Sequence, residues 1–233
     1  MSARPLSRLT AIDLYGTELL RSASRPEDAS ALRVVDEHGG ELPFALHRYL
    51  EAPSAEEHGV LARAIGPVLD IGCGPGRHAV ALSRRGVMAV GVDISPLAVR
   101  LARTRGARVI EGSIFDGLPG AGTWGSALLL DGNIGIGGAP RELLERVAGL
   151  LAPTGIVLVE VEGPGVPSGT LQVRLESEQT SSQWFPWALM SIEELPRTVA
   201  AAGFDIHEQW HTGGRWFATL ERSQLLDSTL LRR

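Results

Sequence analysis

The segment VLDIGCGPG, residues 68–76, places a short apolar run directly before three glycines at alternate positions. Val68 to Ile71 predicts a buried strand, and a helix is expected to begin near Arg77. Glycines between a strand and a helix let backbone N–H groups approach a ligand where no side chain would fit. The acidic Asp70 before the glycines makes this pattern more specific than a glycine-rich turn alone. The segment therefore predicts a ligand-binding turn in an α/β fold.

This turn differs from the G-x-G-x-x-G pattern of dinucleotide-binding proteins. Counted from Gly72, that pattern requires a third glycine at position 77, where the chain has Arg77. The glycines lie instead at positions 72, 74 and 76. A nicotinamide- or flavin-dependent enzyme is therefore disfavoured.

Short apolar runs alternate with helical stretches from Pro67 onward. Further helices are predicted from Ser95 to Gly106, over 141–151, and over 191–202 with Ser191 and Glu194 as a capping box. Further strands are predicted at 88–92, 108–111, 127–131, 156–161, 204–210 and 215–221. This order predicts a Rossmann-like, mainly parallel seven-stranded sheet with helices on both faces. The last two runs form a hairpin pattern, so we expect an antiparallel last strand.

Two segments fall outside the alternation. Residues 1–66 predict a helix over about 9–20 and then a hairpin around residues 36–40, with flanking runs at 31–35 and 41–46. Residues 163–190 are rich in Gly, Pro, Ser and Gln and carry the stretches 171–176 and 183–187. Ligands of open α/β sheets bind outside the carboxyl ends of the strands, and both segments are expected to roof that crevice. The expected organisation is an N-terminal lid or cap segment (1–66), a ligand-binding domain (67–222) with a substrate-side insertion (163–190), and a C-terminal tail (223–233).

An acidic residue ends the second predicted strand, in Gly91-Val92-Asp93. A carboxylate at this position can accept hydrogen bonds from both hydroxyls of a ribose, as an adenosine ligand presents them. The alternative is an aspartate that only caps the next helix. Its place shortly after DIGCGPG favours the ribose interpretation.

These motifs, together with EGSIFD (residues 111–116) and the strand ending at Asp131, resemble the successive motifs of class I S-adenosylmethionine-dependent methyltransferases. The resemblance is close over residues 66–161 and follows the order of elements to about residue 222. GNIGIGG (132–138) and GGRWF (213–217) are similar to a subgroup of small bacterial methyltransferase-domain proteins.

The resemblance implies S-adenosyl-L-methionine as cofactor and S-adenosyl-L-homocysteine as product. It assigns the methionine part and the sulfonium to Asp70 and the backbone of the glycine turn, the ribose to Asp93, and the adenine to the residues after the second and third strands. The implied cofactor-binding residues are Asp70, Gly72, Cys73, Gly74, Gly76, Asp93, Ile94, Ser113, Ile114 and Asp131. Many relatives have an acidic residue where Ser113 stands, and Cys73 is interpreted as a small packing residue.

Acceptor-binding residues are predicted with less support from spacing. Asn133 either orients an acceptor or bonds to its own turn, and the aromatic side chains of the cap and insertion either wall the substrate or pack within their segments. His211 is a possible base near the crevice, with a surface role as the alternative. The candidates are Tyr15, Asn133, Trp184, Trp187 and His211. The Asn/Asp-Pro-Pro-Tyr sequence of many amino-group methyltransferases is absent.

Composition narrows the function further. The 233 residues have a formal net charge of −5, contain no lysine and include a single cysteine. We therefore expect no nucleic-acid partner, no Schiff-base chemistry, no disulfide framework and no metal site. No apolar run suits a membrane span or a secretion signal, so a cytoplasmic protein is expected, as a monomer or homodimer.

The sequence thus predicts a methyltransferase acting on a small molecule at oxygen, nitrogen or carbon. Transfer from a sulfonium is a direct in-line displacement, which positioning alone accelerates and which requires no single catalytic residue. Two alternatives remain: a protein-modifying methyltransferase, and a non-catalytic protein that only binds S-adenosylmethionine.

Overall fold

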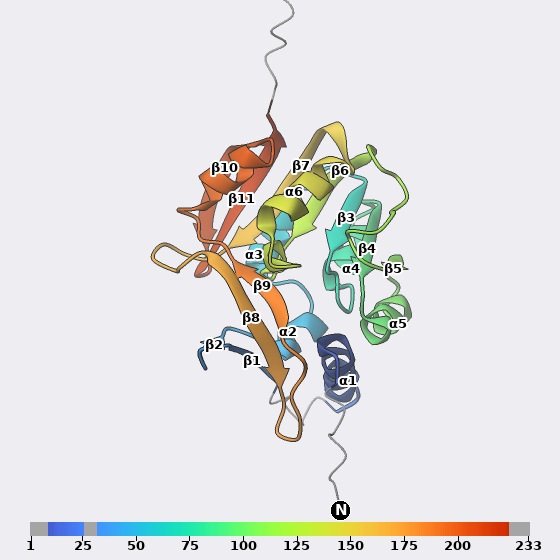
Figure 1. The fold of residues 1–233 in the computed structure, drawn as a ribbon. Helices are drawn as coiled ribbons and strands as arrows, with labels where there is room; N and C mark the ends of the chain where they lie inside the picture. Colours follow the sequence, from blue (N-terminus) through green and yellow to red (C-terminus); the bar gives the residue numbers. More distant parts are fainter. Residues whose placement is uncertain (1–8, 26–31, 224–233) are drawn as a thin grey trace, which may run out of the picture.

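The computed structural model describes residues 9–25 and 32–223, and its larger sheet has the strand order β10-β11-β7-β6-β3-β4-β5 (Figure 1). Strands β7, β6, β3, β4 and β5 pair in parallel, whereas β11 pairs antiparallel with both β7 and β10. The strands are β3 (Val68–Ile71), β4 (Ala89–Asp93), β5 (Val109–Glu111), β6 (Trp124–Leu129), β7 (Leu151–Val161), β10 (Phe204–Thr212) and β11 (Arg215–Arg222). The predicted mainly parallel sheet with an antiparallel last strand is confirmed.

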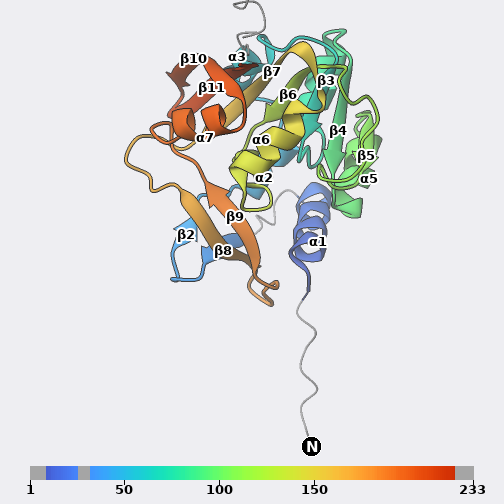
Figure 2. The same cartoon turned by 45° about the horizontal axis from the view of Figure 1, so that its top comes forward.

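Alternate side chains of the strands enter two separate cores, because successive residues of a strand point to opposite faces. Leu69 of β3 packs with residues of α6 (Pro140–Ala148) and α7 (Leu195–Ala201), which lie against one face of the sheet (Figure 2). Val68 packs on the other face, with residues of α3 (Ala55–Leu61), α4 (Arg77–Arg84) and α5 (Pro96–Thr104). The prediction of helices on both faces is therefore confirmed.

A second, four-stranded sheet lies beyond the carboxyl ends of the parallel strands, in the order β2-β1-β8-β9 (Figure 1). It combines the N-terminal hairpin, β1 (Arg33–Asp36) and β2 (Glu41–Leu42), with the insertion strands β8 (Gly169–Glu176) and β9 (Phe185–Leu189). Helices α1 (Ala11–Ser24) and α2 (Leu46–Leu50) share a third apolar core with it. The two segments outside the alternation thus form one structure, which we call the cap.

Several predicted boundaries were wrong. The helix predicted over 191–202 begins at Leu195, because Ser191 instead forms a β-bridge with Glu162. The Ser191 hydroxyl accepts the Glu194 N–H and also bonds to the Ser168 hydroxyl. The strand predicted at 127–131 ends at Leu129, and the second strand of the predicted hairpin is short, Glu41–Leu42. Apart from Ser223, the predicted C-terminal tail lies outside the described residues.

Across residues 9–25 and 32–223, no helix is long and apolar enough to cross a membrane. The same residues contain no cluster of three or more His, Cys, Asp or Glu side chains able to hold a metal ion.

Candidate active site

A cavity of about 840 Å³ lies between the carboxyl ends of the parallel strands and the cap. Its walls come from the turns after β3, β4, β5, β6 and β7 and, opposite them, from α1, α2, β8 and β9. This volume falls within the range of about 300–1,000 Å³ typical of small-molecule sites. The place agrees with the general position of ligands in open α/β sheets.

The glycine turn after β3 exposes its backbone to this cavity. Gly72, Gly74 and Gly76 all have positive φ values, from 51° to 77°. A Cβ atom added to Gly74 would lie 2.8 Å from the Tyr15 hydroxyl of α1, so this position requires glycine for space as well as for conformation. The turn is followed directly by the N-terminus of α4, whose first N–H groups lack partners within the helix.

Asp93 connects this turn to the next one. Its carboxylate accepts hydrogen bonds of 2.8 Å from the backbone N–H groups of Gly74 and Ser95. Burial raises the pKa of Asp93, and the two hydrogen bonds, which lower it, do not fully compensate. The carboxylate can therefore gain from further hydrogen-bond donors. Beyond it, Ile94 and Phe115 present half-exposed apolar side chains to the same cavity.

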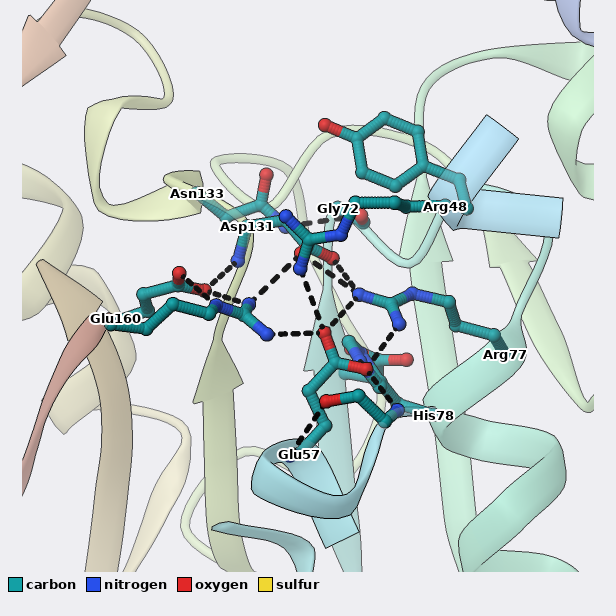
Figure 3. Close-up of polar contacts among 12 residues, drawn as sticks. Arg48, Glu57, Gly72, Arg77, His78, Asp131, Asn133 and Glu160 are labelled. Carbon is teal, nitrogen blue, oxygen red and sulfur yellow. Dashed lines mark hydrogen bonds and ion pairs between the residues drawn. The ribbon is translucent and has the colours of Figure 1, made fainter. Parts of the chain in front are cut away.

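Glu57 of α3 lies at the centre of a buried ion-pair network beneath the cavity (Figure 3). Its side chain is 1% exposed and accepts hydrogen bonds from Arg77, from Arg215 at 2.6 Å and from the Ser54 backbone at 2.8 Å. Burial alone would raise the pKa of Glu57, but the Arg77 guanidinium outweighs it and the pKa lies well below its ordinary value. Glu57 is therefore an ionised carboxylate shared by two arginines.

The network continues to the edge of the cavity. Arg77 also binds Asp131 at 2.7 Å, and Arg215 binds Glu160 at 2.6 Å. Asp131 has φ 56°, a left-handed conformation that aspartate tolerates better than most residues, and its N–H donates to Glu160 at 2.7 Å. With Arg48 3.3 Å from Glu57, three arginines face three carboxylates. The charges are thus paired before any ligand binds.

Comparisons with known proteins agree with this geometry. A family model described as a methyltransferase domain matches residues 68–155. The chain is similar to the S-adenosylmethionine-dependent methyltransferase from Bacteroides fragilis, whose structure contains S-adenosyl-L-homocysteine: 26% identity, TM-score 0.77, covering 94% of this chain and 98% of that one. The chain is a class I S-adenosylmethionine-dependent methyltransferase. S-adenosylmethionine is the cofactor of this enzyme.

Two further structures share the fold of this methyltransferase at lower identity. One is the 1,6-didemethyltoxoflavin N1-methyltransferase of Burkholderia thailandensis, at 17% identity and TM-score 0.58, covering 96% of this chain and 94% of that one. The other is an amino pentose methyltransferase from Micromonospora echinaspora, at 21% identity and TM-score 0.55, covering 79% and 99%.

Most of the residues predicted to bind cofactor line the cavity of the methyltransferase together. These are Gly72, Cys73, Gly74, Asp93, Ile94, Ser113, Ile114 and Asp131. The Ser113 hydroxyl already accepts one hydrogen bond, from the Phe115 N–H at 3.1 Å. Gly76 is set back from the cavity, where a Cβ atom would lie 2.8 Å from Ala107 Cβ.

Asp70 and Cys73 are both buried next to the glycine turn. Asp70 is 2% exposed and does not line the cavity; its Oδ1 lies 3.8 Å from His78 Nδ1. The Oδ2 atom of Asp70 has no hydrogen-bond partner among the described residues, and the role of Asp70 in cofactor binding stays a prediction. Burial raises the pKa of the Cys73 thiol, which faces Gly91 and stays protonated, as expected for a packing residue.

Four of the five predicted acceptor-binding residues line the cavity: Tyr15, Asn133, Trp184 and Trp187. The Asn133 amide donates to the carbonyls of Ile71 at 2.8 Å and Gly72 at 3.1 Å, so it holds the glycine turn after β3 and not its own turn. His211 lies outside the cavity. Its ring is exposed on β10 and packs on Trp216 at a centroid distance of 4.9 Å, and it is Trp216 that reaches the cavity.

Sequence reasoning missed the charged network of this methyltransferase. Ser54 and Glu57 form a capping box, and that spacing was visible in the sequence. The partnership of Glu57 with Arg77 and Arg215 was not, because the three residues are separated by 20 and 158 positions.

Proposed function

We propose that this methyltransferase acts on a small-molecule acceptor enclosed between the parallel sheet and the cap. The observation that supports this proposal is the cavity beneath the cap. Its wall opposite the parallel sheet is built by β8 and β9 of the insertion and by the N-terminal segment. An enclosed, mostly apolar site suits a small molecule better than an extended polypeptide. Two enzymes with the same fold are themselves named for small acceptors, a toxoflavin precursor and an amino pentose.

The cofactor would occupy the half of the cavity next to β3, β4 and β5. The residues present fit it: exposed backbone for the methionine part, the donor-poor Asp93 carboxylate for the ribose hydroxyls, and apolar Ile94 and Phe115 for the adenine. When bound, S-adenosylmethionine supplies a methyl group activated by its sulfonium. The protein then needs to hold the acceptor in line and exclude water, for which effective molarities of about 10⁵ M or more are known.

A protein substrate is the runner-up, and the net charge of −5 speaks against nucleic acid. A labelling experiment separates these classes. The protein is incubated with methyl-labelled S-adenosylmethionine and either the low-mass or the protein fraction of a cell extract. We expect enzyme-dependent label in the low-mass fraction only.

Label in the protein fraction alone would replace the proposal by the runner-up. Cofactor binding without transfer to either fraction would instead favour a non-catalytic binding protein. A boiled-enzyme sample controls for label that the extract's own enzymes transfer.

Gly74→Ala tests the proposed cofactor half. The new Cβ lies 2.8 Å from the Tyr15 hydroxyl and requires a left-handed backbone, so the turn or the Tyr15 side chain must shift. We expect at least about tenfold weaker binding of S-adenosylmethionine, measured by calorimetry. Gly86→Ala is the matched control: its φ of 78° carries the same backbone cost, about 1–2 kcal/mol, but no atom lies within 4 Å of the new Cβ. Equal affinity in both variants would contradict the assignment.

A further inference from the structure

The strand order divides the cavity into two halves. The glycine turn follows β3, Asp93 ends β4, and Ser113 lies just after β5. In the sheet, β4 and β5 lie on one side of β3, whereas β6 and β7 lie on its other side. Neighbouring strands are about 4.8 Å apart, so the carboxyl end of β7 lies on the order of 10 Å from that of β3. If the cofactor occupies the first half, as proposed above, the acceptor is left with the end of the cavity next to β7.

Glu162 is the first residue after β7 and lines this end of the cavity. It points to the same side of the chain as Glu160, two residues earlier, because side chains alternate along a strand. Glu160 is neutralised by Arg215. In contrast, no hydrogen bond or ion pair joins the Glu162 carboxylate to any side chain of the described residues. It is the cavity's one unpartnered carboxylate within that part of the chain.

The position of Glu162 is fixed by its backbone and not by its side chain. Its N–H donates to Met190 at 2.8 Å, and its carbonyl accepts from Ile192 at 2.9 Å. Burial, with the nearby charge of Glu160, raises the pKa of Glu162. A desolvated carboxylate without donors gains more from a ligand hydrogen bond than a solvated one does.

Apolar side chains line this end of the cavity next to the Glu160–Arg215 ion pair. Met190, directly after β9, accepts the Glu162 N–H with its carbonyl, and Trp216 of β11 pairs with Val161. Trp187 of β9 forms a β-bridge with Ile136 and also lines the cavity. Phe185 meets Trp187 edge to face at 6.4 Å between ring centroids. These walls suit a flat apolar body, and the carboxylate suits a single hydrogen-bond donor on it.

We propose that Glu162 accepts a hydrogen bond from the nucleophilic hydroxyl of an aromatic acceptor and so selects phenol-like substrates. The inference rests on the proposed function. During transfer the acceptor oxygen bonds to the methyl carbon, the sulfonium sulfur keeps the electron pair of the broken bond, and the hydroxyl proton passes to Glu162. Anionic aromatic compounds are rejected by the same carboxylate.

Three probes of one shape test this selection: 2-naphthol, 2-methoxynaphthalene and 2-naphthoate. Each is titrated by calorimetry into protein saturated with S-adenosyl-L-homocysteine. We expect 2-naphthol to bind at least about tenfold more tightly than the other two, the effect of one hydrogen bond to a charged group. Glu162→Gln, in which an amide donor faces the ligand, should lose the discrimination against 2-naphthoate. Glu193→Gln, at an exposed carboxylate that accepts a hydrogen bond from the Gly165 N–H, is the matched control and should retain it.

Equal affinity of the wild type for 2-naphthol and 2-naphthoate would overturn the inference, as would unchanged discrimination in Glu162→Gln. Binding of S-adenosyl-L-homocysteine without binding of any probe would also overturn it. The labelling experiment above remains independent, since it reports transfer to small molecules of any class. Failure of the two proposals is therefore distinguishable.

Discussion

Replacement of Glu57 by glutamine is expected to lower the free energy of unfolding by about 3–5 kcal/mol, the usual effect of removing one partner from a buried ion pair. The variant keeps the shape of the side chain but leaves Arg77 and Arg215 with less negative charge than they need. Both guanidinium groups are buried, at 4% and 14% side-chain exposure. Urea unfolding followed by circular dichroism measures the change.

Glu194→Gln is the matched control. Glu194 pairs with Arg197 on the surface of α7, where an ion pair contributes about 0–1 kcal/mol. A loss in Glu57→Gln no larger than in Glu194→Gln would show that the buried network contributes little.

The same variant should change the response to acid. The pKa of Glu57 is lowered in the folded state, so its contribution to stability is complete above its ordinary pKa of 4.5 and is lost as the pH falls below that value. Asp93 and Glu162 oppose this trend, since their raised pKa values favour the folded state in acid. Between pH 5 and pH 3 we therefore expect the stability difference between wild type and Glu57→Gln to shrink. A constant difference would contradict the assignment of an ionised Glu57.

Replacement of Asp93 by alanine is expected to weaken binding of S-adenosylmethionine about 10- to 150-fold, the range for one hydrogen bond to a charged group. The carboxylate holds the N–H of Gly74 as well as facing the cavity, so its loss also loosens the glycine turn. Calorimetric titration measures the affinity, with NADH as a ligand that should give no response.

Asp205→Ala controls for a general effect of losing an aspartate. Asp205 is exposed on β10, away from the cavity. Wild-type affinity in Asp93→Ala would exclude Asp93 as the ribose ligand, whereas wild-type affinity in Asp205→Ala is expected.

The sequence predicted the larger sheet well, because its signals are local. Apolar runs, glycine turns and the Ser95-Pro96 helix start each depend on a few neighbouring residues, and the α5 cap formed as expected. The place of the glycine turn and Asp93 at the cavity followed for the same reason, since both stand at the carboxyl ends of their strands. The family resemblance supplied the ligand to which these positions correspond.

The cap and the charged network depend on contacts that local patterns do not encode. The hairpin was expected, but not that β1 would pair with β8, from Arg33 opposite Glu176. His211 was misplaced because β10 is the edge strand of the sheet, and its ring packs on Trp216 of β11, the strand between β10 and β7. No local sequence pattern singles out Glu162. It becomes a candidate only because Arg215 pairs with Glu160 and not with Glu162.

The position of Glu57 shows that the part of the chain matched by the family is smaller than the part held together by the charged network. The family model begins at residue 68, yet the charge that compensates Arg77 comes from α3, upstream of that boundary, and Arg215 comes from β11, far downstream. A fragment cut at the family boundaries would carry Arg77 without Glu57 and leave Asp131 as its one carboxylate partner among the described contacts. Recombination or domain grafting in this protein should therefore treat residues 54–216 as indivisible, whatever the recognisable motif suggests.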